Sequence, residues 1–87
     1  MAYVVAVYDV HARRVARVMK IFRRYLNHIQ HSVFEGELSS AQRRRLEDEL
    51  RNVIDRTYDH IVFYAWTDPR YLRRSALGAD TTAGRIL

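Results

Sequence analysis

The chain has 87 residues, 48% of them hydrophobic, and a formal net charge of +5, which is enough for one small domain and too little for two. It contains no cysteine, which excludes a disulfide scaffold and thiolate-based zinc or redox chemistry. No apolar run approaches the roughly 20 residues that cross a bilayer, and the N-terminus lacks the basic region of a signal peptide. We therefore expect a soluble, cytoplasmic protein with no membrane partner.

Arginine accounts for 14 of the 15 basic side chains. Its planar guanidinium group carries five donors that match carboxylate and phosphate oxygens, so this bias favours a phosphate-bearing partner. A thermophilic origin or a GC-rich genome also enriches arginine, and composition alone leaves these explanations open.

Residues 2–10 are rich in β-branched and aromatic side chains and predict a first strand. Its two faces are Tyr3, Val5, Val7 and Asp9 on one side and Val4, Ala6, Tyr8 and Val10 on the other. Because both faces are largely apolar, we expect this strand to lie in the centre of a sheet.

A helix is predicted next, over about residues 11–26, from apolar side chains at helical spacing. These side chains are Val15, Val18, Met19, Phe22 and Leu26. Residues 28–38 read as extended, with a bend near Ser32 that divides them into two short strands. Ser39 with Gln42 three residues later is a capping-box pattern, so a second helix is expected from there to about Arg56.

The remaining elements are a strand over residues 58–67, which Asp68 and Pro69 end, and an edge strand over residues 71–77. The order predicts an α+β, ferredoxin-like sandwich over residues 1–78, with two helices on one face of an antiparallel sheet and a C-terminal tail at 79–87. Helices cover only one face of such a sheet. We expect a second copy to cover the other face, giving a homodimer packed sheet to sheet.

Between residues 10 and 34 the chain has six basic side chains and no acidic one. Four of them lie in one narrow sector of the first helix, opposite its apolar stripe, along roughly 16 Å of helix axis. They are Arg13, Arg17, Lys20 and Arg24. Two of the six basic side chains, Arg13 and Arg14, lie in the first turn, where the helix dipole disfavours cations. We interpret this basic stripe, with Arg14 beside it, as a contact for a nucleic-acid backbone rather than a plain solvated face.

The second helix provides a comparison. Arg43, Arg44 and Arg45 are followed four residues later by Glu47, Asp48 and Glu49. Pairs at this spacing neutralise each other on a helix surface. This run is therefore predicted to be a self-neutralised, solvated face.

Asp9 closes the first strand, and two roles are open for it. It can cap the N-terminus of the following helix, a position that aspartate favours. It can also be a ligand for a hard cation, because one or two carboxylates, with waters and a substrate phosphate, suffice for Mg²⁺. If a dimer axis passes near the first strand, two copies of Asp9 converge on one shared site.

Other chemical candidates are weaker. The four histidines, at positions 11, 28, 31 and 60, lack the spacing of a helical zinc motif. His11 is close enough to Asp9 to be a general base, although a loop histidine is more often merely exposed. His28 and His31 more naturally pack or hydrogen-bond. No glycine-rich phosphate loop or serine elbow occurs. Tyr8 and Phe34 are candidates for stacking on bases, although aromatic side chains in strands more often belong to the core or an interface.

One stretch is more specific than these patterns. A short strand ending in Tyr8-Asp9, an arginine-rich helix, and then the segment Ile29-Gln30-His31-Ser32-Val33-Phe34-Glu35-Gly36-Glu37-Leu38 resemble the family of the second CRISPR-associated protein. The resemblance runs from Val4 to Gly78. That family is the small core subunit of spacer acquisition, so the resemblance implies a ferredoxin-like homodimer whose C-terminal strand crosses to the partner's sheet. Residues 84–87 are the segment available for that strand.

The resemblance also implies roles for particular residues. Asp9 corresponds to the Mg²⁺ ligand contributed by both protomers, and Tyr8, Arg14 and Phe34 to positions implicated in family members that are nucleases. The chain departs at His28, where members with ribonuclease activity can carry arginine. The implied partners are the CRISPR-associated integrase, double-stranded DNA and single-stranded RNA.

Several functions agree with these features. The leading hypothesis is a dimeric spacer-acquisition protein that binds duplex DNA and carries a Mg²⁺-dependent endonuclease site at paired Asp9. The alternatives are a DNA-binding scaffold without catalysis, a ribonuclease toxin on the same fold, an RNA-binding module that uses its sheet, and a small-molecule regulatory domain. The missing RNP1 pattern argues against the module, and the basic stripe argues against the regulatory domain.

Overall fold

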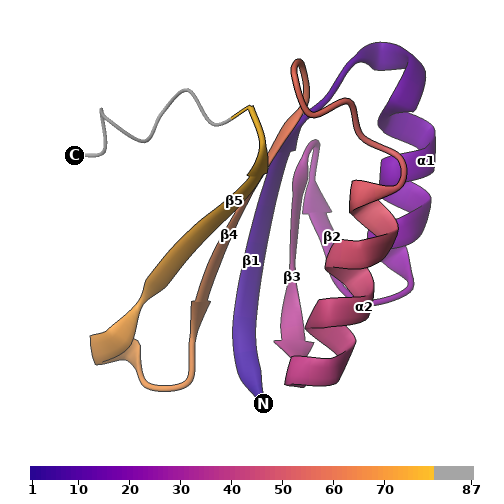
Figure 1. The fold of residues 1–87 in the computed structure, drawn as a ribbon. Helices are drawn as coiled ribbons and strands as arrows, with labels where there is room; N and C mark the ends of the chain where they lie inside the picture. The colour runs from indigo at the N-terminus through magenta and orange to yellow at the C-terminus, as the bar shows by residue number, and fades with distance from the viewer. Residues whose placement is uncertain (80–87) are drawn as a thin grey trace.

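The computed structural model describes residues 1–79. The elements, in chain order, are β1 (Ala2–Asp9), α1 (Ala12–Arg23), β2 (Asn27–Gln30), β3 (Val33–Leu38), α2 (Ser40–Arg51), β4 (His60–Trp66), the 3-10 turn η1 (Pro69–Tyr71) and β5 (Arg73–Gly78). The five strands form one antiparallel sheet in the order β2-β3-β1-β4-β5. Both helices lie on one side of it (Figure 1). The predicted α+β ferredoxin-like sandwich is therefore confirmed.

Both helices end earlier than predicted. α1 stops at Arg23 rather than near Leu26, and α2 stops at Arg51 rather than near Arg56. The apolar spacing continues through the turn after each helix, because Leu26 and Ile54 still reach the core and are 5% and 9% exposed. Their backbone N–H groups donate to carbonyls four residues back. The apolar spacing thus correctly predicts which side chains reach the core, but it continues past the residue where each regular helix ends.

The start of α2 agrees with its sequence pattern. The Ser39 hydroxyl accepts from the backbone N–H of Gln42, and the Gln42 side chain accepts from the backbone N–H of Ser39. The predicted bend between the two short strands is also present. It is a turn in which His31 has a φ of 39°, a left-handed conformation that is uncommon for residues other than glycine.

The core lies between the helices and the sheet. Phe22 of α1 stacks on Phe34 of β3 with ring centroids 4.9 Å apart, and Phe63 of β4 lies 6.3 Å from Phe22. All three rings have no exposed surface. Tyr8 stacks on Phe22 at 5.8 Å from the helix-facing side of β1, so the C-terminal end of this strand is fixed by the core.

The opposite face of the sheet carries no helix in residues 1–79 (Figure 1). Its centre is apolar, because Val5 and Val7 of β1 pair across the sheet with Tyr64 and Val62 of β4. Val7 is 36% exposed. This agrees with the prediction that both faces of β1 are apolar and that one face is left without a covering element.

The strand after η1 joins the sheet as an edge, as predicted. The predicted tail begins at Ala79, and residues 80–87 lie outside the described part of the chain. No helix among the described residues is both long and apolar enough to cross a membrane.

Candidate metal and nucleic-acid site

Asp9 is the last residue of β1 and is exposed on the open face of the sheet. Its carboxylate forms no hydrogen bond or ion pair with any residue in 1–79. The cap of α1 is instead His11, whose Nδ1 accepts from the backbone N–H of Arg13 at 3.1 Å. The capping role considered for Asp9 is therefore wrong, and the side chain is available for a ligand.

His60 is a neighbour of Asp9 in the sheet. The two residues are directly opposite each other in the β1–β4 ladder. Side chains opposite each other in an antiparallel pair share a face, with Cβ atoms about 4.5–5.5 Å apart. Sequence reasoning missed this pair because it joins residues 51 positions apart and depends on the strand register.

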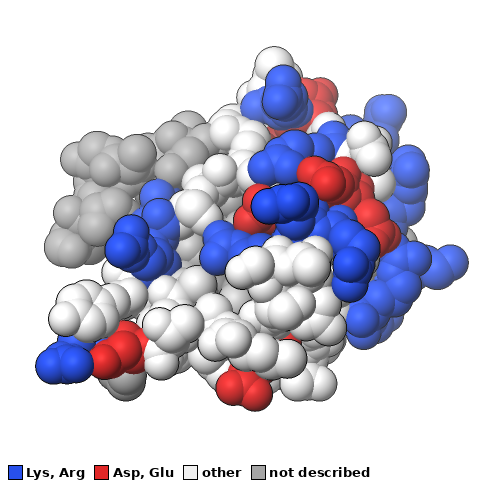
Figure 2. Space-filling model, turned by 60° about the horizontal axis from the view of Figure 1, so that its bottom comes forward, with Lys and Arg blue, Asp and Glu red and all other residues white. Residues whose placement is uncertain are grey.

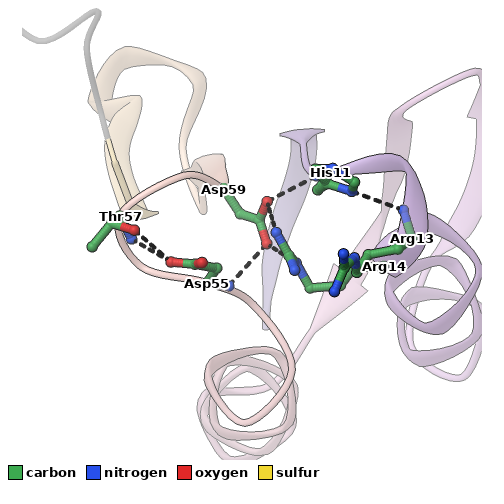
Figure 3. Close-up of polar contacts among 6 residues, drawn as sticks. All are labelled: His11, Arg13, Arg14, Asp55, Thr57 and Asp59. Carbon is green, nitrogen blue, oxygen red and sulfur yellow. Dashed lines mark hydrogen bonds and ion pairs between the residues drawn. The ribbon is translucent and has the colours of Figure 1, made fainter.

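The turn after Asp9 is held by a buried carboxylate, Asp59, which has no exposed surface. One of its oxygens accepts from the backbone N–H of His11 at 2.8 Å, and the other accepts from the backbone N–H of Asp55 at 2.9 Å. The Arg14 guanidinium donates to both oxygens, at 2.5 and 3.0 Å (Figure 3). We call these four residues the Asp59 junction; it ties the start of α1 to the loop between α2 and β4.

The Asp59 junction has a clear electrostatic signature. Burial by itself would raise the pKa of Asp59, but the hydrogen bonds from Arg14 and from the backbone of Asp55 and His11 outweigh it and lower the pKa to about 2. Asp59 was not anticipated from the sequence. The only sequence feature that could have pointed to Asp59 was its position as a single acidic residue directly before an apolar strand.

Arg14 was predicted to contact substrate or phosphate. Its side chain is only 17% exposed, and the hydrogen bonds to Asp59 raise the pKa of its guanidinium. The structure therefore gives Arg14 a different task, which is to position the turn between Asp9 and α1.

Tyr8 and Phe34, the two aromatic candidates, both face the helices. Phe34 has no exposed surface and lies between the rings of Phe22 and His28, so it supports the site from the core rather than touching a substrate. Tyr8 is 6% exposed. Burial raises the pKa of its hydroxyl, and the positive charge of Arg23 opposes this increase.

The basic stripe of α1 is exposed, as predicted. Arg13, Arg17 and Lys20 form no ion pair with residues 1–79. Arg24 differs, because its guanidinium binds Glu49 of α2, which also accepts from the hydroxyl of Tyr25. Figure 2 shows basic side chains gathered on the helix side of the molecule, with acidic side chains between some of them.

The pairing predicted within α2 is only partly correct. Arg43 binds Glu47 at 2.8 Å, as expected. Asp48 binds Arg51 instead of Arg44, and Glu49 binds Arg24 instead of Arg45, because the ends of both acidic side chains reach other arginines. Arg44 and Arg45 are thus exposed without an ion partner in the described part of the chain, and they add positive charge to the surface of α2.

Comparison with known proteins decides the family. A family model described as CRISPR associated protein Cas2 matches residues 1–74. The chain belongs to the Cas2 family. The match agrees with the resemblance inferred from the segment that ends β2 and forms β3.

Individual Cas2 proteins are similar over almost the whole chain. The CRISPR-associated endoribonuclease Cas2 of Methanosarcina acetivorans is 45% identical over 83 residues, which cover 92% of this chain and 95% of that protein. The protein of the same name from Thermotoga maritima is 40% identical over 78 residues, 90% of each. A solved structure described as the crystal structure of cas2 has a TM-score of 0.74 at 36% identity and covers 99% of this chain and 97% of that one.

The Mg²⁺ implied by the resemblance to Cas2 proteins can be tested against the residues present. No group of three or more His, Asp or Glu side chains in residues 1–79 is placed to hold a metal ion. Asp9 offers two free carboxylate oxygens, the ligand type that Mg²⁺ prefers, whereas His60 offers nitrogen. One chain therefore fits Mg²⁺ only as a partial site, which a second carboxylate, waters or a substrate phosphate must complete.

Proposed function

We propose that this Cas2-family protein acts in CRISPR spacer acquisition as a homodimer that binds nucleic acid and hydrolyses phosphodiester bonds at a Mg²⁺ site shared by two copies of Asp9. The observation that carries the proposal is the free carboxylate of Asp9 at the edge of an apolar sheet face that no helix covers in the described part of the chain. The relatives named as endoribonucleases support hydrolysis as the reaction.

The open sheet face supports dimerisation. An exposed apolar face on a domain this small normally meets a partner, and a two-fold arrangement lets one patch cover itself. Because Asp9 lies on the same face as Val5 and Val7, sheet-to-sheet packing brings two Asp9 carboxylates toward one seam. The C-terminal segment expected to cross to the partner's sheet, residues 84–87, lies outside the described residues.

The chain's own residues have distinct tasks at this seam. Asp9 holds the cation, and the Asp59 junction keeps the following turn, with His11, in one position. When bound, Mg²⁺ polarises the phosphodiester and makes water a stronger acid, which is the chemistry that a single carboxylate lacks.

The basic stripe supplies the nucleic-acid contact. Arg13, Arg17 and Lys20 are free to meet phosphates, and Arg44 and Arg45 extend the positive surface onto α2. A row of cations without base-reading groups binds backbone rather than sequence. We propose double-stranded DNA, presented together with the CRISPR-associated integrase, as the ligand of this surface, with single-stranded RNA as a second substrate class.

The test is the change Asp9→Asn, which keeps the size of the side chain and removes its charge. We expect cleavage of labelled RNA and DNA oligonucleotides to fall at least a hundredfold and calorimetric Mg²⁺ binding to be lost. The dimer, measured by sedimentation, should persist. Glu37→Gln is the matched control, since Glu37 is an exposed acid on the same face, next to the opposite end of β1. Cleavage that survives Asp9→Asn with its metal dependence intact would overturn the catalytic proposal.

A scaffold without hydrolysis is the second candidate. The observation that favours it is that one chain supplies a single carboxylate and no cluster of metal ligands in the described residues. In that case Asp9→Asn leaves spacer acquisition unchanged in cells, while the loss of basic-stripe charge reduces it.

A further inference from the structure

A hollow of about 560 Å³ lies beside the C-terminal end of β1, between α1 and the β2–β3 turn. Its apolar lining includes Tyr8, Val15 and Met19, and its polar lining includes His28 and His31. Asp9 also lines it, so the hollow adjoins the proposed cation site. Its size is within the range of ligand pockets, roughly 300–1,000 Å³.

The hydroxyl of Tyr8 has no hydrogen-bond partner among residues 1–79, although the residue is more than nine-tenths buried. It is not one of the fully buried polar atoms that lack a partner, so the hydroxyl keeps a contact with the exterior. Tyr8 is also one of the residues that line the hollow. A ligand in the hollow can therefore hydrogen-bond to this hydroxyl in place of water.

His28 is held in a fixed orientation at the wall of the hollow. Its ring stacks on Phe34, with centroids 4.6 Å apart and an interplanar angle of 20°. Its Nε2 lies 2.7 Å from the carbonyl oxygen of His31 and must donate to it, because a carbonyl only accepts. In the neutral ring, Nδ1 is then an acceptor, and it has no partner among the described residues.

A carboxylate lines the hollow, and a cation lies close to it. Arg23 is exposed, forms no ion pair in residues 1–79, and lies one helical turn after Met19 on the same side of α1. Asp9 is at the end of the strand that carries Tyr8. The combination is an apolar floor, two hydrogen-bonding groups, a cation suited to phosphate and a carboxylate suited to a metal ion.

We propose that this hollow holds one unstacked base of a single-stranded nucleic acid, whose backbone passes Arg23 and places the adjoining phosphodiester at Asp9. The proposal rests on the proposed function, because it names the form of substrate that the Asp9 site receives. A base inside a duplex is paired and stacked on both sides, so only a single-stranded or extruded base enters a hollow between a helix and a hairpin. The hydroxyl of Tyr8 and Nδ1 of His28 give the base edge a donor and an acceptor.

Binding measured in EDTA tests this inference separately from cleavage. The probes are fluorescent single-stranded oligoribonucleotides and oligodeoxyribonucleotides of one sequence, the corresponding duplexes, and a single strand of the same length built of abasic units. We expect Tyr8→Phe to weaken single-strand binding about threefold to tenfold and His28→Ala about tenfold, with duplex affinity unchanged. The abasic strand should bind the unaltered protein about as weakly as normal strands bind His28→Ala.

Gln30→Ala is the matched control, since Gln30 is exposed in the same strand as His28 and does not line the hollow. Circular dichroism establishes that each variant is folded, and Tyr8→Phe removes one oxygen only, so it tests the hollow even if His28→Ala disturbs the ring stack. A larger loss for the ribonucleotide or the deoxyribonucleotide identifies which strand is preferred. Unchanged single-strand affinity in Tyr8→Phe and His28→Ala, or an equal loss with duplexes, would overturn the proposal. A loss of cleavage in Asp9→Asn bears on the proposed function alone.

Discussion

Arg13 and Arg14 are consecutive residues with the same side chain, and the structure gives them opposite surroundings. Arg13 is exposed and forms no ion pair in the described part of the chain. Arg14, about 100° further round the helix, is largely buried and binds Asp59 with two nitrogens. The comparison shows that the direction of a side chain, and a buried acid in reach, decide whether an arginine holds the fold or serves a ligand.

The two arginines also differ in energetic terms. A buried ion pair cannot lose one partner without leaving the other charge desolvated, so breaking it is costly. An exposed, unpaired cation contributes little to stability, but its field extends about 8–10 Å into physiological salt and attracts a polyanion. The Asp59 junction is therefore expected to govern folding, and the basic stripe to govern binding.

The largest effect is expected at the junction. Asp59→Asn removes the charge that Arg14 needs and replaces one acceptor oxygen by a donor group. We expect the free energy of unfolding in urea to fall by about 3 kcal/mol, as for other broken buried pairs. Asp48→Asn is the control, because Asp48 is 62% exposed and its pair with Arg51 should be worth less than about 1 kcal/mol. Equal effects of the two changes would mean that the junction does not stabilise the fold.

Acid should reproduce this loss. The pKa of Asp59 is about 2 in the folded protein and 3.8 ordinarily, so the folded state binds fewer protons between these values. The stabilisation is complete above about pH 4 and is lost as the pH falls through the folded pKa, a loss of about 2 kcal/mol. Urea unfolding of the unaltered protein and of Asp59→Asn should therefore differ at pH 6 and converge near pH 2. A difference that stays constant with pH would contradict this assignment.

The smallest effect on stability is expected at the basic stripe. Replacing Arg13, Arg17 and Lys20 together by glutamine should change the free energy of unfolding by less than about 0.5 kcal/mol, because all three are exposed. The salt dependence of duplex DNA binding should flatten by about 0.9 in log–log slope for each phosphate that the variant no longer neutralises. Arg51→Gln is the control, since that cation already binds Glu47 and Asp48. An unchanged slope in the triple variant would remove the stripe from the nucleic-acid interface.

These contrasts show why part of the site was visible in the sequence. The strand that ends at Asp9 and the row of Arg13, Arg17 and Lys20 follow from periodicity, since alternation and helical spacing fix which side chains share a face. The partners of Arg44 and Arg45 did not follow, because Asp48 and Glu49 each had a competing arginine, one on the same helix and one directly after α1. Spacing identifies the pairs that are available, and packing selects among them.

The sequence by itself determined the strand and helix order, the capping box at Ser39, the apolar pattern of β1 and the Cas2-like segment through β3. Each of these features depends on residues that are close together in the chain. Only the tertiary structure decided that Asp59 lies beneath Arg14, that His60 is opposite Asp9, and that the hydroxyl of Tyr8 has no partner among residues 1–79 at the edge of a hollow. Those relations join residues far apart in the chain, and they depend on strand register and helix placement. The spacing of residues along the chain does not specify strand register or helix placement, so these contacts can be identified only in the folded structure.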